Sequence, residues 1–144
     1  MSEKNKATIA VRHGIEADKH HGAVVPPIYL STTYSFADFD TKRQYDYGRS
    51  GNPNRDILAE TLAELEGGAR GIITATGMSA VHLATQLLNS GDTLVIPHDC
   101  YGGSYRLFTS LEKRGLLKLK VLDLTKTENL QEILAIKPKL IWIE

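Results

Sequence analysis

The fold is decided by the stretch LVIPHDCYGGSYRLFTSLEKRGLLKLKV, residues 94–121. It opens with the apolar run Leu94–Ile96, which Pro97 stops, and it continues into a helical pattern over residues 104–114. Residues 117–121 then alternate apolar and charged side chains, as a half-exposed strand does. Two parallel strands need a crossover between them, usually a helix. The stretch therefore predicts a strand, a helix and a second, parallel strand.

The same alternation continues on both sides. We expect a helix capped by Asn52 and ended by Gly67-Gly68, a buried strand over 71–75, helices over 78–88 and 129–135, and an apolar strand over 140–143. Strands that alternate with helices predict an α/β fold with a mainly parallel sheet. Because a parallel strand is normally followed by a covering helix, a chain that stops after residue 143 resembles part of a larger domain.

Residues 1–55 have a different sequence pattern. They show no sustained helical period, Pro26-Pro27 forces an extended stretch, and residues 32–36 have strand-like composition. An arm of this kind rarely packs on itself, so we expect it to cross another domain or subunit. The expected division is an arm over 1–55 and a regular domain from 56 to 144.

Composition excludes several classes of protein. The chain is 42% hydrophobic and 24% charged, and its 17 basic and 17 acidic residues cancel. That balance argues against a nucleic-acid partner held by bulk attraction. No apolar run is long enough to span a membrane, and no secretory leader is recognisable at the start. The single cysteine, Cys100, excludes an internal disulfide framework and favours a reducing cytoplasm.

Two turns are candidates for binding an anion. Gly77 lies where the expected strand meets the helix over 78–88, and free amides at a helix start suit a phosphate, although neither common nucleotide fingerprint is present. Without a ligand, such a glycine serves only to make a turn. In the second turn, Tyr47 offers a hydroxyl and Arg49 a planar fork suited to phosphate or carboxylate. A solvated turn is the alternative there.

A third candidate follows the strand over 94–96. Tyr101 lies at the carboxyl edge of the expected parallel sheet, where open α/β folds bind ligands, and Gly102-Gly103 leave room for a ring against the backbone. Tyr101 either stacks on a planar ligand or packs within its loop. A metal site at residues 98–100 is disfavoured, because three adjacent side chains cannot easily face one ion. Cys100 lacks an identifiable activating base.

Five ordered motifs together resemble a known family. They are GAVVPPIYLSTTY over residues 22–34, YGRSGNP over 47–53, LEGG over 65–68, TGMSA over 76–80 and HDCYGG over 98–103. In this order they resemble the amino-terminal part of the pyridoxal-phosphate (PLP) enzymes of cysteine and methionine metabolism. The resemblance implies the fold of type I PLP enzymes. It makes residues 1–55 an arm at a subunit interface and 56–144 an incomplete PLP-binding domain.

The resemblance also implies roles for individual residues. Gly77 and Met78 would donate backbone amides to the cofactor phosphate. Tyr101 would stack on the pyridine ring as a catalytic, cofactor-binding residue. Tyr47 and Arg49 would reach the phosphate of a neighbouring subunit, in a cytoplasmic tetramer built from dimers that share active sites.

Substrate chemistry follows from the same resemblance. Arg106 matches a position that binds the distal carboxylate of the substrate in the synthases, whereas Ser50 replaces a second arginine, which puts succinyl-ester specificity in doubt. The implied reaction is γ-replacement on an O-acylhomoserine by cysteine, giving cystathionine. The alternatives are γ-elimination, as in the family's γ-lyases, and a non-catalytic assembly fragment. In the family the Schiff-base lysine lies in a Ser-x-Thr-Lys stretch, which this chain lacks, so the chain alone is expected to be inactive.

Overall fold

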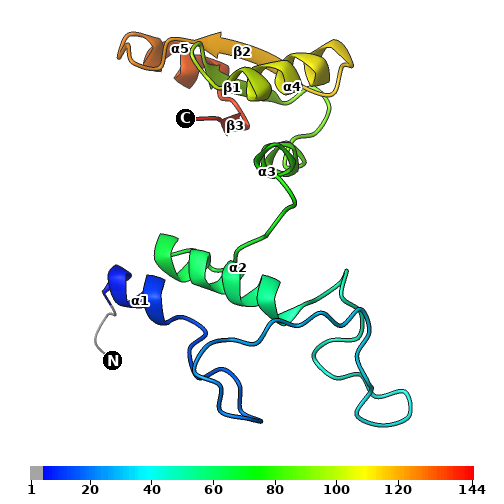
Figure 1. Cartoon of the computed structure of the whole chain (residues 1–144). Coiled ribbons are helices and arrows are strands. Elements are labelled where there is room, and N and C mark those ends of the chain that lie inside the picture. The colour runs from blue at the N-terminus through cyan, green and yellow to red at the C-terminus, as the bar shows by residue number, and fades with distance from the viewer. Residues whose placement is uncertain (1–4) are drawn as a thin grey trace. The chain divides into compact units, whose positions relative to one another are not determined.

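The computed structural model describes residues 5–144. They form two compact units, one ending at Ile73 and the other starting at Thr74 (Figure 1). The first unit contains helices α1 (Lys6–Arg12) and α2 (Pro53–Glu66). The second contains α3 (Gly77–Thr85), β1 (Thr93–Pro97), α4 (Gly102–Lys113), β2 (Lys118–Leu122), α5 (Asn129–Ile136) and β3 (Leu140–Ile141).

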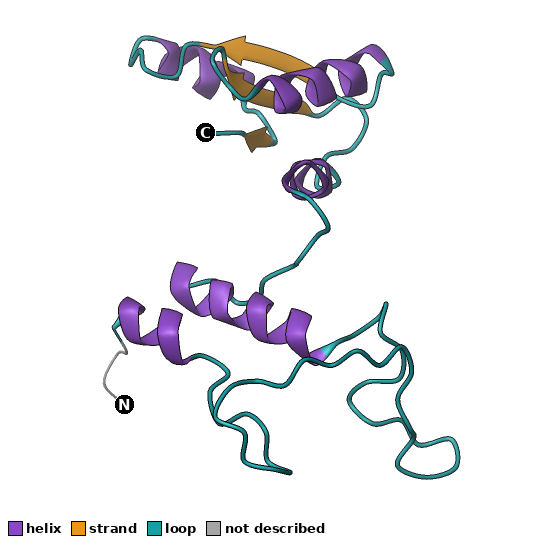
Figure 2. Cartoon of the chain, viewed as in Figure 1, coloured by secondary structure: helices purple, strands orange, loops and turns teal. Residues whose placement is uncertain are grey.

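The second unit is built on a three-stranded parallel sheet in the order β2-β1-β3. Strand β1 lies in the centre, and its residues Leu94, Val95 and Ile96 are completely buried. Figure 2 shows the strands together with the helices that connect them. The expected α/β class with a parallel sheet is confirmed, and so is the strand-helix-strand unit β1-α4-β2.

Aromatic packing joins α4 to the sheet. Phe108 on α4 is fully buried in a cluster with Leu94 and Ile96. Its ring meets the Trp142 ring edge-on, with centroids 5.6 Å apart. Since Trp142 also donates its backbone N–H to the carbonyl of Val95 at 2.8 Å, the segment after β3 is held beside β1. The carboxyl ends of these two strands therefore lie at one edge of the sheet.

The first unit contains one helix that was expected and one that was not. Asn52 caps α2 by accepting the Asn54 amide, and Gly67 ends it with φ +66°. Helix α1, inside the arm expected to lack regular structure, is a correction. A helix of 7 residues is too short to display a period, and it is held by burial of Ile9 and by His13, whose Nδ1 lies 2.9 Å from the Glu64 carboxylate.

The strand expected over 71–75 is wrong. No strand forms there in the described residues, and Ile72 is 71% exposed. An apolar run becomes a strand only when it pairs, and the sheet that the structure describes takes its three strands from elsewhere. Residues 32–36 likewise make only an isolated bridge, between Thr33 and Tyr47. The last strand pairs over Leu140–Ile141 rather than over 140–143.

Candidate functional site

The start of α3 presents free backbone amides. Thr76 caps the helix, with its Oγ1 accepting the Ser79 amide at 3.1 Å and its carbonyl accepting the Ala80 amide at 3.2 Å. Gly77 and Met78 are the first helical residues, and the first amides of a helix have no partner within it. A Cβ at Gly77 would meet nothing within 4 Å, so this turn is open. The arrangement suits an anion with several oxygens.

Tyr101 lies beside that turn. It directly precedes α4 and its side chain is 64% exposed. The ring covers Gly103, where a Cβ would collide with the ring edge and lie 2.9 Å from the Met78 sulfur. The ring of Tyr101 and the side chain of Met78 thus meet at Gly103, where a Cβ would displace at least one of them. The open space beside Gly102-Gly103 expected from the sequence is occupied at Gly103 by the ring of Tyr101 itself.

Arg106 lies one turn further along α4. Its Nη1 comes within 3.4 Å of the position that a Cβ on Gly102 would take, so the guanidinium runs back along the first turn of the helix. The side chain is exposed. Of the residues identified from sequence, Met78, Tyr101 and Arg106 are thereby arranged around the first turn of α4.

In the first unit the loop before α2 holds Tyr47 and Arg49 together. The Arg49 guanidinium carbon lies 4.8 Å from the centre of the Tyr47 ring, a cation–π distance. Arg55 on α2 donates to the carbonyls of Gly48 and Arg49 at 3.3 and 3.1 Å. Ser50 donates to the Tyr47 carbonyl at 2.8 Å. Hydrogen bonds therefore fix the backbone of the loop, while the side chains of Arg49 and Ser50 remain exposed.

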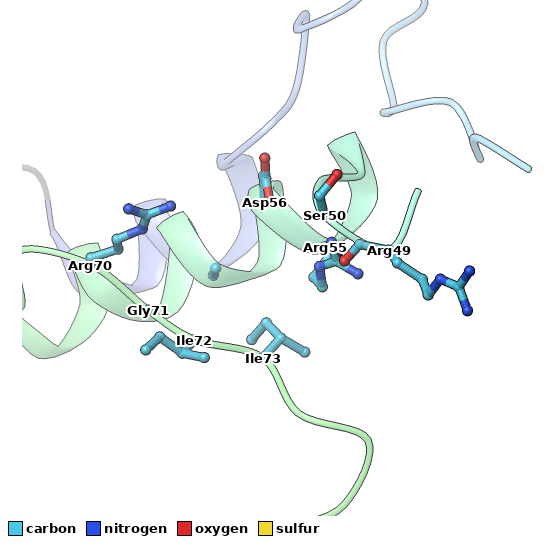
Figure 3. Close-up of a pocket in the computed structure, with 9 residues that line it drawn as sticks. Arg49, Ser50, Arg55, Asp56, Arg70, Gly71, Ile72 and Ile73 are labelled. Carbon is cyan, nitrogen blue, oxygen red and sulfur yellow. Dashed lines mark hydrogen bonds between the residues drawn. The ribbon is translucent and has the colours of Figure 1, made fainter. Parts of the chain in front are cut away.

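A basic pocket of about 450 Å³ opens beside this loop (Figure 3). Arg49, Arg55 and Arg70 line it together with the carboxylate of Asp56. In Figure 3, Arg49 and Arg70 lie at opposite ends. Sequence reasoning found Arg49 but missed Arg55, which anchors the loop. The position of Arg55 in the first turn of a helix that directly follows the loop is the signal that could have found it.

Three further observations concern metal binding, the reactivity of Cys100 and membrane crossing. No group of three or more metal-binding side chains is present between residues 5 and 144. Burial, and then the charge of Glu144, raise the pKa of the Cys100 thiol, which favours the less reactive protonated form. In the same part of the chain no helix is long and apolar enough to cross a membrane.

Each unit taken by itself offers groups that suit part of a ligand with a phosphate and a flat ring. In the second unit, the helix amides at Gly77 and Met78 can donate to a phosphate and the exposed Tyr101 ring can stack on a planar ring. In the first unit, the guanidinium of Arg49 can donate to a phosphate. Tyr47 and Arg49 belong to the first unit and the other site residues to the second, and each group is ordered within its own unit. PLP has both chemical features.

Known proteins resemble nearly all of the chain. Residues 7–144 match the model of the Cys/Met metabolism PLP-dependent enzyme family. Cystathionine gamma-synthase of Escherichia coli is 54% identical over 142 residues, covering 98% of this chain and 37% of that protein. Cystathionine gamma-lyase of Dictyostelium discoideum is 37% identical over 138 residues, covering 95% of the chain and 36% of that protein.

A solved structure also matches nearly all of the chain. Cystathionine gamma-synthase of Xanthomonas oryzae pv. oryzae, in complex with aminoacrylate and cysteine, matches 97% of this chain and 36% of its own, with 56% identity and a TM-score of 0.92. The chain therefore spans little more than a third of the length of these relatives. The family match over residues 7–144 and the agreement in fold establish that the chain belongs to the Cys/Met metabolism PLP-dependent enzyme family.

Proposed function

We propose that the chain is the first segment of a cystathionine gamma-synthase. In this proposal Gly77 and Met78 bind the cofactor phosphate through their amides and Tyr101 stacks on the ring. The observation that carries it is the meeting of the Tyr101 ring and the Met78 side chain at Gly103, which brings the aromatic ring to the second residue of α3. PLP, when bound, stabilises carbanions by acting as an electron sink. The chain's own residues hold and orient it.

The proposed reaction is γ-replacement on an O-acylhomoserine by cysteine, which yields cystathionine and the free carboxylic acid. Arg106 is exposed, so its fork can bind a carboxylate of the substrate. The similarity to two cystathionine gamma-synthases, at 54% and 56% identity, supports this reaction over others of the family.

The proposal also assigns a role to the arm, residues 1–55. Residues 1–55 would lie at an interface of a cytoplasmic homotetramer, with Tyr47 and Arg49 reaching the phosphate of a neighbouring subunit and residues 56–144 beginning the PLP-binding domain. Large apolar side chains of the arm support an interface, since Ile28, Leu30 and Phe39 are 81%, 89% and 96% exposed.

A γ-elimination lyase is the second candidate. Its support is the similarity to a cystathionine gamma-lyase, at 37% identity. Ser50 bears on the acyl group of the substrate instead: its hydroxyl closes the local turn by bonding to Asp46 and Tyr47 where some synthases carry a second arginine. Loss of a carboxylate-binding group would weaken selection for a succinylated substrate.

A chimera tests both candidates. Residues 1–144 replace the matching segment of the E. coli cystathionine gamma-synthase, which supplies the remainder of a complete chain. We expect PLP-dependent formation of cystathionine from an O-acylhomoserine and cysteine. Release of cysteine, 2-oxobutanoate and ammonia from cystathionine, without γ-replacement, would favour the γ-lyase. A chimera that assembles with subunits of the unmodified E. coli enzyme but catalyses neither reaction would favour the non-catalytic assembly role.

A further inference from the structure

Glu144 connects two segments that are far apart in the sequence. Its carboxylate accepts the backbone N–H of Tyr101 on one oxygen and the hydroxyl of Ser104, at 2.8 Å, on the other. Ser104 is completely buried in the first turn of α4, so its hydroxyl is directed by this contact. One side chain thereby ties the segment after β3 to the residue that precedes α4.

The geometry points to Glu144 as a positioning residue for Tyr101, a role that rests on the proposed function of Tyr101 as the ring that stacks on the cofactor. The backbone N–H of Tyr101 donates to the Glu144 carboxylate. Its ring lies over Gly103, beside the sulfur of Met78. Since these contacts leave the ring 64% exposed, they direct its face without covering it.

The fold anchors the segment that carries Glu144. Trp142 is bonded to Val95 of β1 and packs against Phe108 of α4, so the segment that carries Glu144 is anchored two residues earlier. The first cause of the lowered pKa of Glu144 is the Tyr101 N–H, which favours the charged form that binds both donors best. The carboxylate therefore joins the segment after β3 to Tyr101, which precedes α4, and to Ser104 in the first turn of that helix.

The test uses the chimera described above, with Glu144→Ala and Glu144→Gln. In the first measurement, amide hydrogen exchange is followed at Tyr101. Loss of a bond to a charged acceptor is expected to make this amide exchange about tenfold to hundredfold faster in Glu144→Ala. The amide of Lys118, bonded to the Asp92 carbonyl at 2.8 Å, is the control in the same unit and should not change.

In the second measurement, PLP release and the visible circular dichroism of bound PLP are recorded, because the latter reports how the ring is held. Glu144→Ala should release PLP faster and change the dichroic band. Glu144→Gln should recover much of both, since its amide oxygen can accept from Tyr101 while its NH₂ donates to the Ser104 oxygen. Ser104→Ala, which removes one contact only, should show a smaller effect than Glu144→Ala.

Two outcomes overturn the inference. One is an unchanged Tyr101 exchange rate in Glu144→Ala. The other is normal PLP release and dichroism in that variant while Tyr101→Ala alters both. If Tyr101→Ala itself leaves PLP binding unchanged, the proposed stacking is wrong, whereas the exchange measurement still judges the contact between Glu144 and Tyr101.

Discussion

Tyr101 presents a ring face to solvent, and this decides which substitutions it can tolerate. Its hydroxyl is not needed for stacking, so Tyr101→Phe in the chimera should retain PLP nearly as well as the unmodified protein. Tyr101→Ala should lose about 0.5–1.5 kcal/mol of stacking beyond the area it buries. PLP release during dialysis measures the difference. Equal release from the Phe and Ala variants would show that the hydroxyl is the important group.

Arg49 offers two parallel donors, and lysine offers only a point charge. Arg49→Ala in the chimera should therefore weaken PLP binding more than Arg49→Lys, by up to the roughly 1.5–3 kcal/mol of a hydrogen bond to a charged group. Titration of the apoenzyme with PLP measures it. Arg70→Ala, at the other end of the same pocket, is the matched control and should bind normally. Equal affinities for both Arg49 variants and the unmodified protein would identify Arg49 as a turn residue only.

Tyr45 links the loop before α2 to that helix, because its O–H donates to the Asp56 carboxylate at 2.9 Å. Burial, and then the bond to Asp56, raise its pKa from 10.0 to about 12. A raised folded-state pKa contributes stability that is complete below the unfolded value and is lost as pH rises from about 10 to about 12. Urea unfolding of the chain from pH 8 to 12 should show this loss, and Tyr45→Phe should remove it. An unchanged pH dependence in Tyr45→Phe would contradict the assignment.

At the scale of elements, the cap of α2 has two functions. Asn52 accepts the Asn54 amide at 2.9 Å, and its own NH₂ donates to the Tyr29 carbonyl at 3.2 Å. The cap therefore also fastens the arm to the helix. Helix α1 is joined to α2 in a comparable way, through the imidazole of His13 and the carboxylate of Glu64.

Asn52→Ala should cost about 0.5–2 kcal/mol in the free energy of unfolding, because the cap is lost. Asn52→Asp keeps an oxygen for the Asn54 amide but removes the donor to Tyr29, so its cost should be smaller. Urea unfolding of the chain, followed by far-ultraviolet circular dichroism, compares the two. If the Ala and Asp variants were equally destabilised, the bond to Tyr29 rather than the cap would be the important contact.

At the scale of the whole molecule, the chain carries the proposed phosphate and ring contacts but no lysine in the family's Ser-x-Thr-Lys context. We therefore predict that the purified 144-residue protein, with added PLP, does not convert O-acylhomoserine and cysteine to cystathionine. The chimera is the positive control in the same assay. Clear product formation by the chain alone would contradict the assignment of these residues to only part of a site.

Much of the fold was predictable because it depends on local chemistry. The cap at Asn52 and the left-handed glycine at Gly67 set the ends of α2 within the chain itself. The helix expected over 78–88 begins one residue earlier, at Gly77, and is α-helical to Thr85. Its last turn tightens, since Leu88 donates to the carbonyl of Thr85.

The sequence by itself determined the α/β alternation, the central strand β1 and the place of Tyr101 after it, since apolar runs, caps and glycines act over a few residues. Only the tertiary structure decided that residues 71–75 remain unpaired. A strand forms only when it pairs with another segment, and its own sequence does not specify that partner. The same holds for Tyr101 and Glu144, which lie 43 residues apart and meet because β1 and β3 pair in parallel and end at one edge of the sheet.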